Sequence, residues 1–172
     1  MPPWIEFLNT TVLSRYQTRL FGGFSEPFYQ AAVNGSDAEI RFTRDFERSA
    51  LHELGHWCIA GGLRRTQDDY GYWYVPDGRT AAQQHRFFDV EIKPQAVEKH
   101  FCTALGTGFE VSADNLGNFP EQDLSAFSLR VQAQYRCYHA SEFPVRACEI
   151  YDCLRRWQTA QSTRTFNAHR QG

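Results

Sequence analysis

The spacing of hydrophobic residues along the chain predicts a series of helices with two short strands. Apolar side chains recur at helical intervals over residues 4–20, which predicts a first helix. They do so again in a second segment that ends at Gly61-Gly62, and either Thr43 or Asp45 would cap the start of this second helix. The remaining predicted elements are helices from Pro94 to Gly106, over residues 122–139 and over residues 144–158, and strands over residues 38–42 and 87–92.

These elements predict an α+β fold in which helices dominate. We expect a single, mainly helical domain with a small β-sheet over residues 1–158. The residues that follow, 159–172, are polar and are predicted to form a flexible C-terminal tail. A length of 172 residues is enough for one domain with a substantial core.

The composition excludes several classes of protein. The net charge is −2 and the isoelectric point is near 6.3, so we expect no direct binding to nucleic acid. The apolar runs fall short of the roughly 20 residues that span a bilayer, so we expect no membrane partner. The cysteines form no C-x-x-C pair and the first residues lack the pattern of an export signal, so we expect a cytoplasmic protein with reduced thiols.

The second predicted helix contains His52-Glu53-Leu54-Gly55-His56, an H-E-x-x-H motif. Histidines four residues apart lie on the same face of a helix, about one turn apart, so both imidazoles can reach one cation. The strand predicted just before this helix gives a local order of elements that is zincin-like, which is an analogy of fold. We therefore predict that His52 and His56 bind a divalent metal ion.

A divalent site of this kind needs a third protein ligand. No histidine follows at the spacing H-E-x-x-H-x-x-G-x-x-H, and Arg64-Arg65 lies near that position instead. We predict Glu98 as the ligand, because it lies in a helix among apolar neighbours and a buried carboxylate needs a cationic partner. Glu91 and Asp89 are the alternatives, since strand alternation would turn either one inward. The lone histidines are interpreted as structural or exposed residues: His85, His100 and His139.

Two histidines and one carboxylate leave open coordination positions on the metal. With Zn²⁺ such a site activates water for hydrolysis, and with Fe²⁺ it forms the facial triad of non-haem oxygenases. Glu53 is the candidate catalytic residue, and it would be the general base in a hydrolase. In an oxygenase it would instead orient a ligand or a water. The spacing alone leaves the metal and the reaction open.

The segment after the predicted metal helix combines acidic and aromatic residues. Asp68 and Asp69 precede a run that contains Tyr70, Tyr72 and Trp73. Paired carboxylates among aromatic rings bind cationic amines through charge and cation–π contacts. We predict that these residues bind the substrate, and the alternative is a solvated acidic turn beside core aromatics.

Several stretches of the sequence are more specific than the motif itself. They lie at residues 42–46, 48–61, 69–74, 76–79 and 91–98. Together they make the chain, over roughly residues 5–158, resemble the bacterial elongation factor P hydroxylase family. The resemblance is most specific in the central region, and the C-terminal helices carry less diagnostic sequence.

The resemblance implies a non-haem iron hydroxylase, an oxidoreductase that uses molecular oxygen and no 2-oxoglutarate. It implies that the substrate is translation elongation factor P, hydroxylated on its β-lysylated lysine. The metal triad of the family maps onto His52, His56 and Glu98. A substrate side chain with additional amines would suit the acidic and aromatic segment at residues 68–73.

Two other functions are compatible with the residues themselves. A zinc-dependent H-E-x-x-H metalloprotease or peptidase would give Glu53 the role of general base and would act without oxygen. A metal-stabilised binding module for a translation factor would have a closed site with no open coordination position. The three functions differ in whether oxygen is consumed and in whether any product forms.

Overall fold

A computed structural model describes residues 1–71, 80–113 and 121–169 of the chain. Its helices are α1 (Trp4–Thr11), α2 (Glu47–Ile59), α3 (Ala81–Leu105), α4 (Glu121–Ala140) and α5 (Val145–His169), with short 3-10 helices η1 (Leu13–Tyr16), η2 (Arg64–Thr66) and η3 (Asp68–Gly71). The strands are β1 (Thr18–Phe24), β2 (Phe28–Gln30) and β3 (Ala38–Thr43). The fold is therefore mainly helical with one small sheet, as the sequence predicts.

The sheet is mixed, with β3 at its centre. Strand β1 pairs with β3 in parallel, and β2 pairs with it antiparallel. In β3 the side chains of Ala38, Ile40 and Phe42 are buried and those between them are half-buried, because alternate residues of a strand point to opposite faces. Helix α2 follows β3 and packs against it, so the sheet supports the helix that carries the H-E-x-x-H motif.

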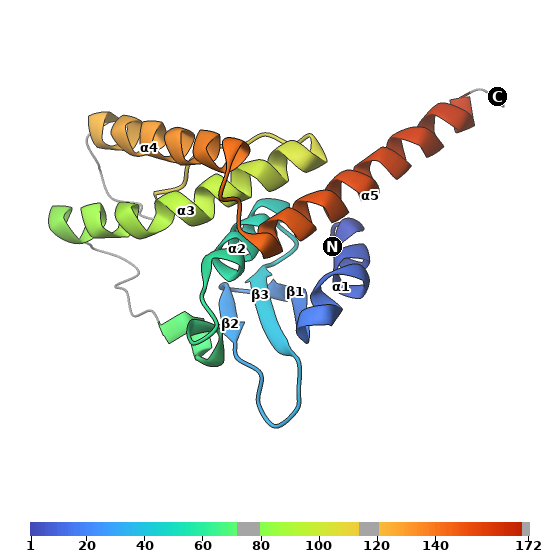
Figure 1. Ribbon diagram of the computed structural model, residues 1–172, viewed down its shortest axis with the longest axis horizontal. Helices are drawn as coiled ribbons and strands as arrows, with labels where there is room; N and C mark the ends of the chain where they lie inside the picture. Colours follow the sequence, from blue (N-terminus) through green and yellow to red (C-terminus); the bar gives the residue numbers. More distant parts are fainter. Residues whose placement is uncertain (72–79, 114–120, 170–172) are drawn as a thin grey trace.

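Helix α3 supports α2 from another side. It contacts α2, α4 and α5, and Figure 1 shows α3 and α4 side by side, with the end of α5 projecting away from the rest of the molecule. Helices α1 to α5 all contribute buried apolar side chains to one core. Its largest fully buried members include Trp4, Trp57, Phe42, Phe101 and Phe127. The core therefore fixes the position of α2 relative to α3.

The N-terminal segment differs from its prediction. The sequence predicts one helix over residues 4–20, but α1 ends at Thr11 and β1 begins at Thr18. Between them Gln17 has a left-handed backbone with φ 48°, a conformation that a continuing helix does not contain. Leu20 is thus a buried strand residue rather than part of a helical face.

The strand predicted over residues 87–92 is wrong, because this segment lies inside α3. Helix α3 begins after Thr80, whose side chain forms a capping box with Gln83. Pro94 therefore lies inside the helix instead of starting it. The end of the helix at Gly106, in the left-handed conformation, agrees with the prediction.

The other predicted elements agree with the structure except at their ends. Strand β3 and helices α4 and α5 confirm the predictions over residues 38–42, 122–139 and 144–158. Helix α2 begins at Glu47 without a side-chain cap, and α5 continues past residue 158 to His169, where the sequence predicts a flexible tail. In the described part of the chain, each helix is too short or too polar to cross a membrane.

Candidate metal centre

Helix α2 carries His52 and His56 on its face toward α3, with ring centroids 4.7 Å apart. Between them, at Gly55, α2 lies close to the backbone of α3. A Cβ atom on Gly55 would lie 2.6 Å from the carbonyl oxygen of Pro94, a distance at which only a glycine fits. The glycine inside the motif therefore lets side chains of the two helices meet.

Helix α3 presents a row of buried polar side chains to α2. Glu91, Gln95 and Glu98 are spaced by four and three residues, which places them on one face of the helix. They are 4%, 0% and 1% exposed, respectively. Buried carboxylates are costly unless charged or hydrogen-bonding partners surround them, and α2 supplies those partners. We call this set of facing residues the polar seam: Arg48, His52, His56, Glu91, Gln95 and Glu98.

The Nε2 atoms of the two histidines converge on the Glu91 carboxylate. His52 Nε2 and His56 Nε2 are 3.1 Å apart. His52 Nε2 lies 3.6 Å from Glu91 Oε2, and His56 Nε2 lies 3.2 Å from Glu91 Oε1. The potential ligand atoms of the three residues all lie within 4.8 Å of one another. Zinc and iron both accept two imidazole nitrogens and a carboxylate oxygen, so these residues fit a divalent metal ion.

Glu98 lies at the other nitrogen of the His52 ring. Glu98 Oε2 is 2.9 Å from His52 Nδ1, and Glu98 Oε1 accepts hydrogen bonds from Arg48 at 3.1 Å and 3.3 Å. A carboxylate at Nδ1 favours the tautomer in which Nδ1 carries the proton and Nε2 can bind a cation. Because Arg48 meets Glu98 whereas His56 meets Glu91, the two helices run antiparallel.

The structure places the two candidate carboxylates, Glu98 and its alternative Glu91, on opposite sides of the His52 ring. The sequence predicts Glu98 as the third ligand, whereas the structure brings Glu91 to the converging nitrogens and Glu98 to the far side of the ring. Asp89, the other alternative, is exposed and forms an ion pair with Arg130 of α4 at 2.6 Å. Asp89 therefore lies outside the polar seam.

The carboxylates of Glu91 and Glu98 favour a positive charge on the His52 ring. Burial lowers the pKa of His52, but its hydrogen bond to Glu98 and the charges of Glu91 and Glu98 outweigh burial and raise the pKa to about 10. Burial raises the pKa of Glu91, but the charges and hydrogen bond of the neighbouring histidines lower it to about 2. These carboxylates therefore favour the protonated form of His52 in the absence of an ion, and a metal ion that bound to its Nε2 atom would displace that proton.

Glu53, the candidate catalytic residue, lies beside the polar seam. Burial raises the pKa of its carboxyl group, the charges of His52 and His56 oppose that shift, and those of Glu91 and Asp69 add to it. A carboxyl group with a raised pKa exchanges protons closer to the operating pH than an exposed glutamate does. Its position within electrostatic range of both histidines suits the handling of protons at the seam.

The acidic segment after α2 is bound to the sheet. Asp69 Oδ1 accepts a hydrogen bond from the backbone N–H of Tyr29, and Asp68 Oδ1 accepts one from that of Ala31, each at 2.9 Å. Tyr70 is buried and stacks on Tyr29 with ring centroids 4.2 Å apart. These contacts give the segment a structural role next to β2.

The backbone of this segment is strained. Asp69, Tyr70 and Gly71 have positive φ values of 46°, 58° and 67°, and the left-handed conformation costs about 1–2 kcal/mol for a residue other than glycine. The bonds to β2 hold the segment in this shape, and the charge of Asp69 acts on Glu53. Of the predicted substrate-binding residues, Tyr72 and Trp73 lie outside the described residues.

The three histidines interpreted as structural or exposed residues, His85, His100 and His139, lie outside the polar seam, in agreement with that interpretation. His100 is buried, stacks on Tyr135 at 4.1 Å between ring centroids, and contacts Phe143 at 4.6 Å. Burial lowers its pKa. His85 and His139 are exposed.

Two histidines of one helix and a buried glutamate of the next define a candidate mononuclear metal centre in a mainly helical protein. The sequence model of the family described as Elongation factor P hydroxylase matches residues 7–167 of the chain. A curated protein of Haemophilus influenzae described as Elongation factor P lysine hydroxylase is 42% identical over 144 residues, which cover 83% of this chain and 80% of that protein. The chain therefore belongs to the elongation factor P hydroxylase family, which confirms the resemblance inferred from its sequence and makes it a hydroxylase.

Sequence reasoning missed two polar residues of the seam. Arg48 lies four residues before His52, and Gln95 lies four residues after Glu91, so each shares a helical face with a candidate ligand. The spacing from His52 was available for Arg48. For Gln95, the spacing of three residues from Glu98 within the predicted helix was also available, whereas its relation to Glu91 was hidden because a strand is predicted over residues 87–92.

Proposed function

We propose that this chain is a non-haem iron, oxygen-dependent hydroxylase that acts on the β-lysylated lysine of translation elongation factor P. The observation that carries the proposal is the convergence of both histidine Nε2 atoms on the Glu91 carboxylate in a member of the elongation factor P hydroxylase family. Two histidines and one carboxylate are the ligand set of non-haem Fe²⁺ oxygenases, in which other coordination positions stay open.

In the proposed centre the protein ligands are His52, His56 and Glu91. Bound Fe²⁺ would supply the activation of dioxygen, without 2-oxoglutarate as a co-substrate. Glu91 brings negative charge to the ion because its low pKa keeps the carboxyl group ionised. Glu98 accepts a hydrogen bond from the Nδ1–H group of His52, which orients the ring and makes Nε2 a better electron-pair donor to the ion.

Glu53 is the proposed catalytic residue of the chain. Its half-buried carboxyl group has a raised pKa and lies within the electrostatic influence of both histidines. We assign it the transfer of a proton to or from the reacting molecules, since a general acid or base works best when its pKa approaches the operating pH.

Asp68, Asp69 and Tyr70 are proposed to bind the substrate, together with Tyr72 and Trp73. Each aspartate uses Oδ1 to accept a backbone hydrogen bond, while its negative charge can attract an ammonium group. A β-lysylated lysine carries such groups, and aromatic rings beside the carboxylates add cation–π attraction. The proximity of Asp69 to Glu53 supports this placement of the substrate next to the polar seam.

The test is intact-mass analysis of β-lysylated elongation factor P incubated aerobically with Fe²⁺-loaded protein and a reductant, without 2-oxoglutarate. We expect the substrate to gain one oxygen atom. The gain should disappear under anaerobic conditions and with the His52→Ala and Glu91→Ala variants, whereas Asp89→Ala serves as the matched control on the same helix.

Two other outcomes would contradict the proposal. Cleavage of the substrate with Zn²⁺ in place of iron, without oxygen and lost in Glu53→Gln, would assign the motif to a metalloprotease. Tight binding of the substrate without any product, unchanged in His56→Ala, would assign the chain to a binding module.

A further inference from the structure

Arg48 connects the polar seam to the extended segment 107–113, which follows α3. Its guanidinium group donates hydrogen bonds to Glu98 Oε1 at 3.1 Å and 3.3 Å. The same group donates to the backbone carbonyl of Glu110 and lies over the ring of Phe109, 5.6 Å from its centroid. One side chain thus holds both a carboxylate beside His52 and the backbone of this segment.

Gln95 makes a second connection of the same kind. Its Nε2 donates to Glu91 Oε2 at 3.1 Å and to the backbone carbonyl of Ser112 at 2.7 Å. Its Oε1 accepts from the backbone N–H of Ser112 at 3.0 Å. Because the amide is held on both sides by the Ser112 backbone, the N–H group that faces Glu91 has a fixed direction.

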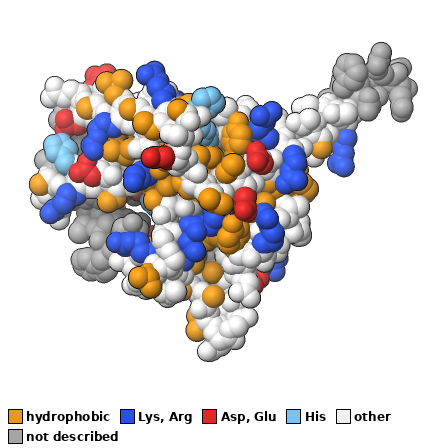
Figure 2. Space-filling view, in the orientation of Figure 1, with side chains coloured by type: hydrophobic (Ala, Val, Ile, Leu, Met, Phe, Trp, Pro, Cys, Tyr) orange, Lys and Arg blue, Asp and Glu red, His pale blue; other side chains and the backbone are white. Residues whose placement is uncertain are grey.

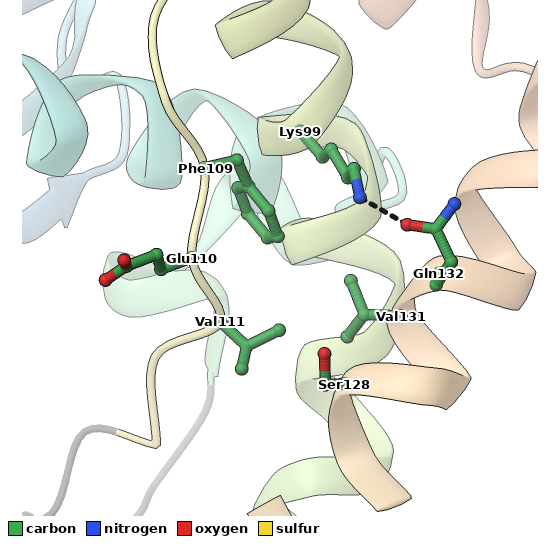
Figure 3. A pocket seen from close by; sticks show the side chains of 7 residues that line it. All are labelled: Lys99, Phe109, Glu110, Val111, Ser128, Val131 and Gln132. Atoms are coloured by element: carbon green, nitrogen blue, oxygen red, sulfur yellow. Dashed lines mark hydrogen bonds between the residues drawn. The ribbon is translucent and has the colours of Figure 1, made fainter. Parts of the chain in front are cut away.

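Two further residues of α3, Lys99 and Gln84, contact segment 107–113. Lys99 lies over the ring of Phe109, 5.5 Å from the centroid, so the ring lies near two cationic side chains. Gln84 donates to the carbonyl of Ala113 at 3.0 Å. The segment lines a pocket of about 280 Å³. Figure 3 shows Phe109 and Val111 on one side of this pocket, opposite Ser128, Val131 and Gln132 of α4.

We propose that Arg48 and Gln95 are positioning residues of the metal centre and that segment 107–113 is the backbone support through which they act. The carboxylates on either side of His52 each have one of these partners, and both partners bind the same short segment. The inference rests on the proposed metal site, because it assumes that His52, His56 and Glu91 hold the ion.

The physical reason is that a ligand binds well only if its direction is set before the ion arrives. Outer partners that orient histidine and carboxylate ligands typically contribute about 10–100-fold to metal affinity. Without Arg48, the buried Glu98 carboxylate would lose a hydrogen-bonding partner and would orient the His52 ring less firmly. Without Gln95, Glu91 would lose the hydrogen bond that selects one direction of its carboxylate.

The experiment measures the affinity of the metal-free protein for Co²⁺, whose visible absorption reports the geometry of its ligands. We expect Arg48→Met and Gln95→Leu to weaken Co²⁺ binding about 10–100-fold and to alter the absorption spectrum, with Arg48→Lys restoring part of the affinity. Phe109→Ala should weaken binding about fivefold, because it removes the ring beside the Arg48 guanidinium. Val111→Ala is the matched control, since Val111 lies in the same segment and lines the same cavity.

Chemical unfolding of each metal-free variant separates loss of positioning from loss of folding. If Arg48→Met does not fold, Gln95→Leu and Phe109→Ala decide the question. Folded variants with the Co²⁺ affinity and spectrum of the original protein would overturn the inference while leaving the metal site intact, provided that His56→Ala loses Co²⁺. If the original protein binds no Co²⁺, or His56→Ala still binds it, the proposed function fails together with this inference.

Discussion

The polar seam and the aromatic cluster around His100 both enclose histidines, with opposite consequences. In the seam, His52 has a glutamate at each ring nitrogen, and its pKa is raised to about 10. In the cluster, His100 lies against Tyr135 and Phe143, and burial lowers its pKa. Both clusters draw on helix α3, so the difference comes from the groups that face each ring.

The comparison shows that burial alone does not identify a ligand histidine. A ring enclosed by aromatic side chains is favoured in its neutral form and contributes to packing. A ring with a carboxylate at one nitrogen, and potential metal ligands beside the other nitrogen, can bind a cation together with those ligands. The four predictions below change one side of this comparison at a time.

Replacing Glu91 should have the largest effect, because it removes the carboxylate that the converging nitrogens share. For Glu91→Ala we expect a loss of iron affinity greater than the roughly 10–100-fold that removal of an outer partner causes, with hydroxylation reduced at least as much. Iron content by mass spectrometry and product by intact mass measure the two effects. Retention of iron in Glu91→Ala, with loss in Glu98→Ala, would establish Glu98 as the third ligand and contradict our assignment.

Replacing Gly55 should disturb the seam without changing any of its polar groups. In Gly55→Ala the new Cβ would lie 2.6 Å from the Pro94 carbonyl oxygen, so α2 and α3 must shift apart. Overpacking of this kind costs about 1–3 kcal/mol, which the gain of about 1 kcal/mol in helix propensity offsets only in part. Chemical unfolding should show lower stability, and metal titration should show weaker binding.

The control for Gly55 is Gly61→Ala, since a Cβ atom at Gly61 would meet nothing within 4 Å. We expect it to keep its stability and metal affinity. Equal behaviour of the two variants would mean that the close approach of α2 and α3 is not required.

Removing one charge beside the seam should have a smaller effect that is confined to the substrate. Asp69→Asn keeps an Oδ1 atom for the N–H of Tyr29 but loses the negative charge. We expect KM for the modified substrate to rise about fivefold, equivalent to about 1 kcal/mol, with iron content unchanged. Asp89→Asn, at an exposed position outside the polar seam, gives the matched control, and an unchanged KM in Asp69→Asn would remove this residue from the substrate site.

The last prediction concerns the response of the two histidine environments to pH in the metal-free protein. The pKa of His100 is lowered by burial, so its contribution to stability is present above about 6.5 and is lost as the pH falls below that value. The pKa of His52 is raised, so its contribution is present below about 6.5 and is lost as the pH rises toward about 10.

Urea unfolding between pH 5 and pH 9 measures both pH responses. His100→Phe should reduce the loss of stability on the acidic side and leave the basic side unchanged. A variant with the same acidic loss as the original protein would show that His100 does not cause it.

Much of the fold could be predicted from the sequence, and α3 shows why the rest could not. In the N-terminal part of the helix the buried positions are Gln84, Phe88 and Glu91. Helix prediction from periodicity assumes that buried positions are apolar, and here two of the three are polar. The residues around Val90 then looked like an alternating strand. Buried polar residues, including Glu91 of the candidate metal centre, thus interrupt the apolar periodicity by which this part of α3 could be predicted as a helix.

The same limit applies to the metal ligands. His52 and His56 could be paired from their spacing alone, since both lie on one helix. Glu91 and Glu98 are seven residues apart and lie on the same face of α3, so spacing cannot choose between them. The choice depends on how α2 and α3 are placed against each other, and that follows from contacts such as the one between Gly55 and Pro94.

An ion held between α2 and α3 would also affect the lifetime of the protein. In the sequence, His56 lies before and Glu91 lies after the segment that joins the two helices, so an ion bound to both would cross-link the polypeptide as a disulfide does. An ion at about one hundred times its dissociation constant stabilises a folded protein by about 2.7 kcal/mol. The supply of that ion would then govern how long each molecule resists unfolding and proteolysis.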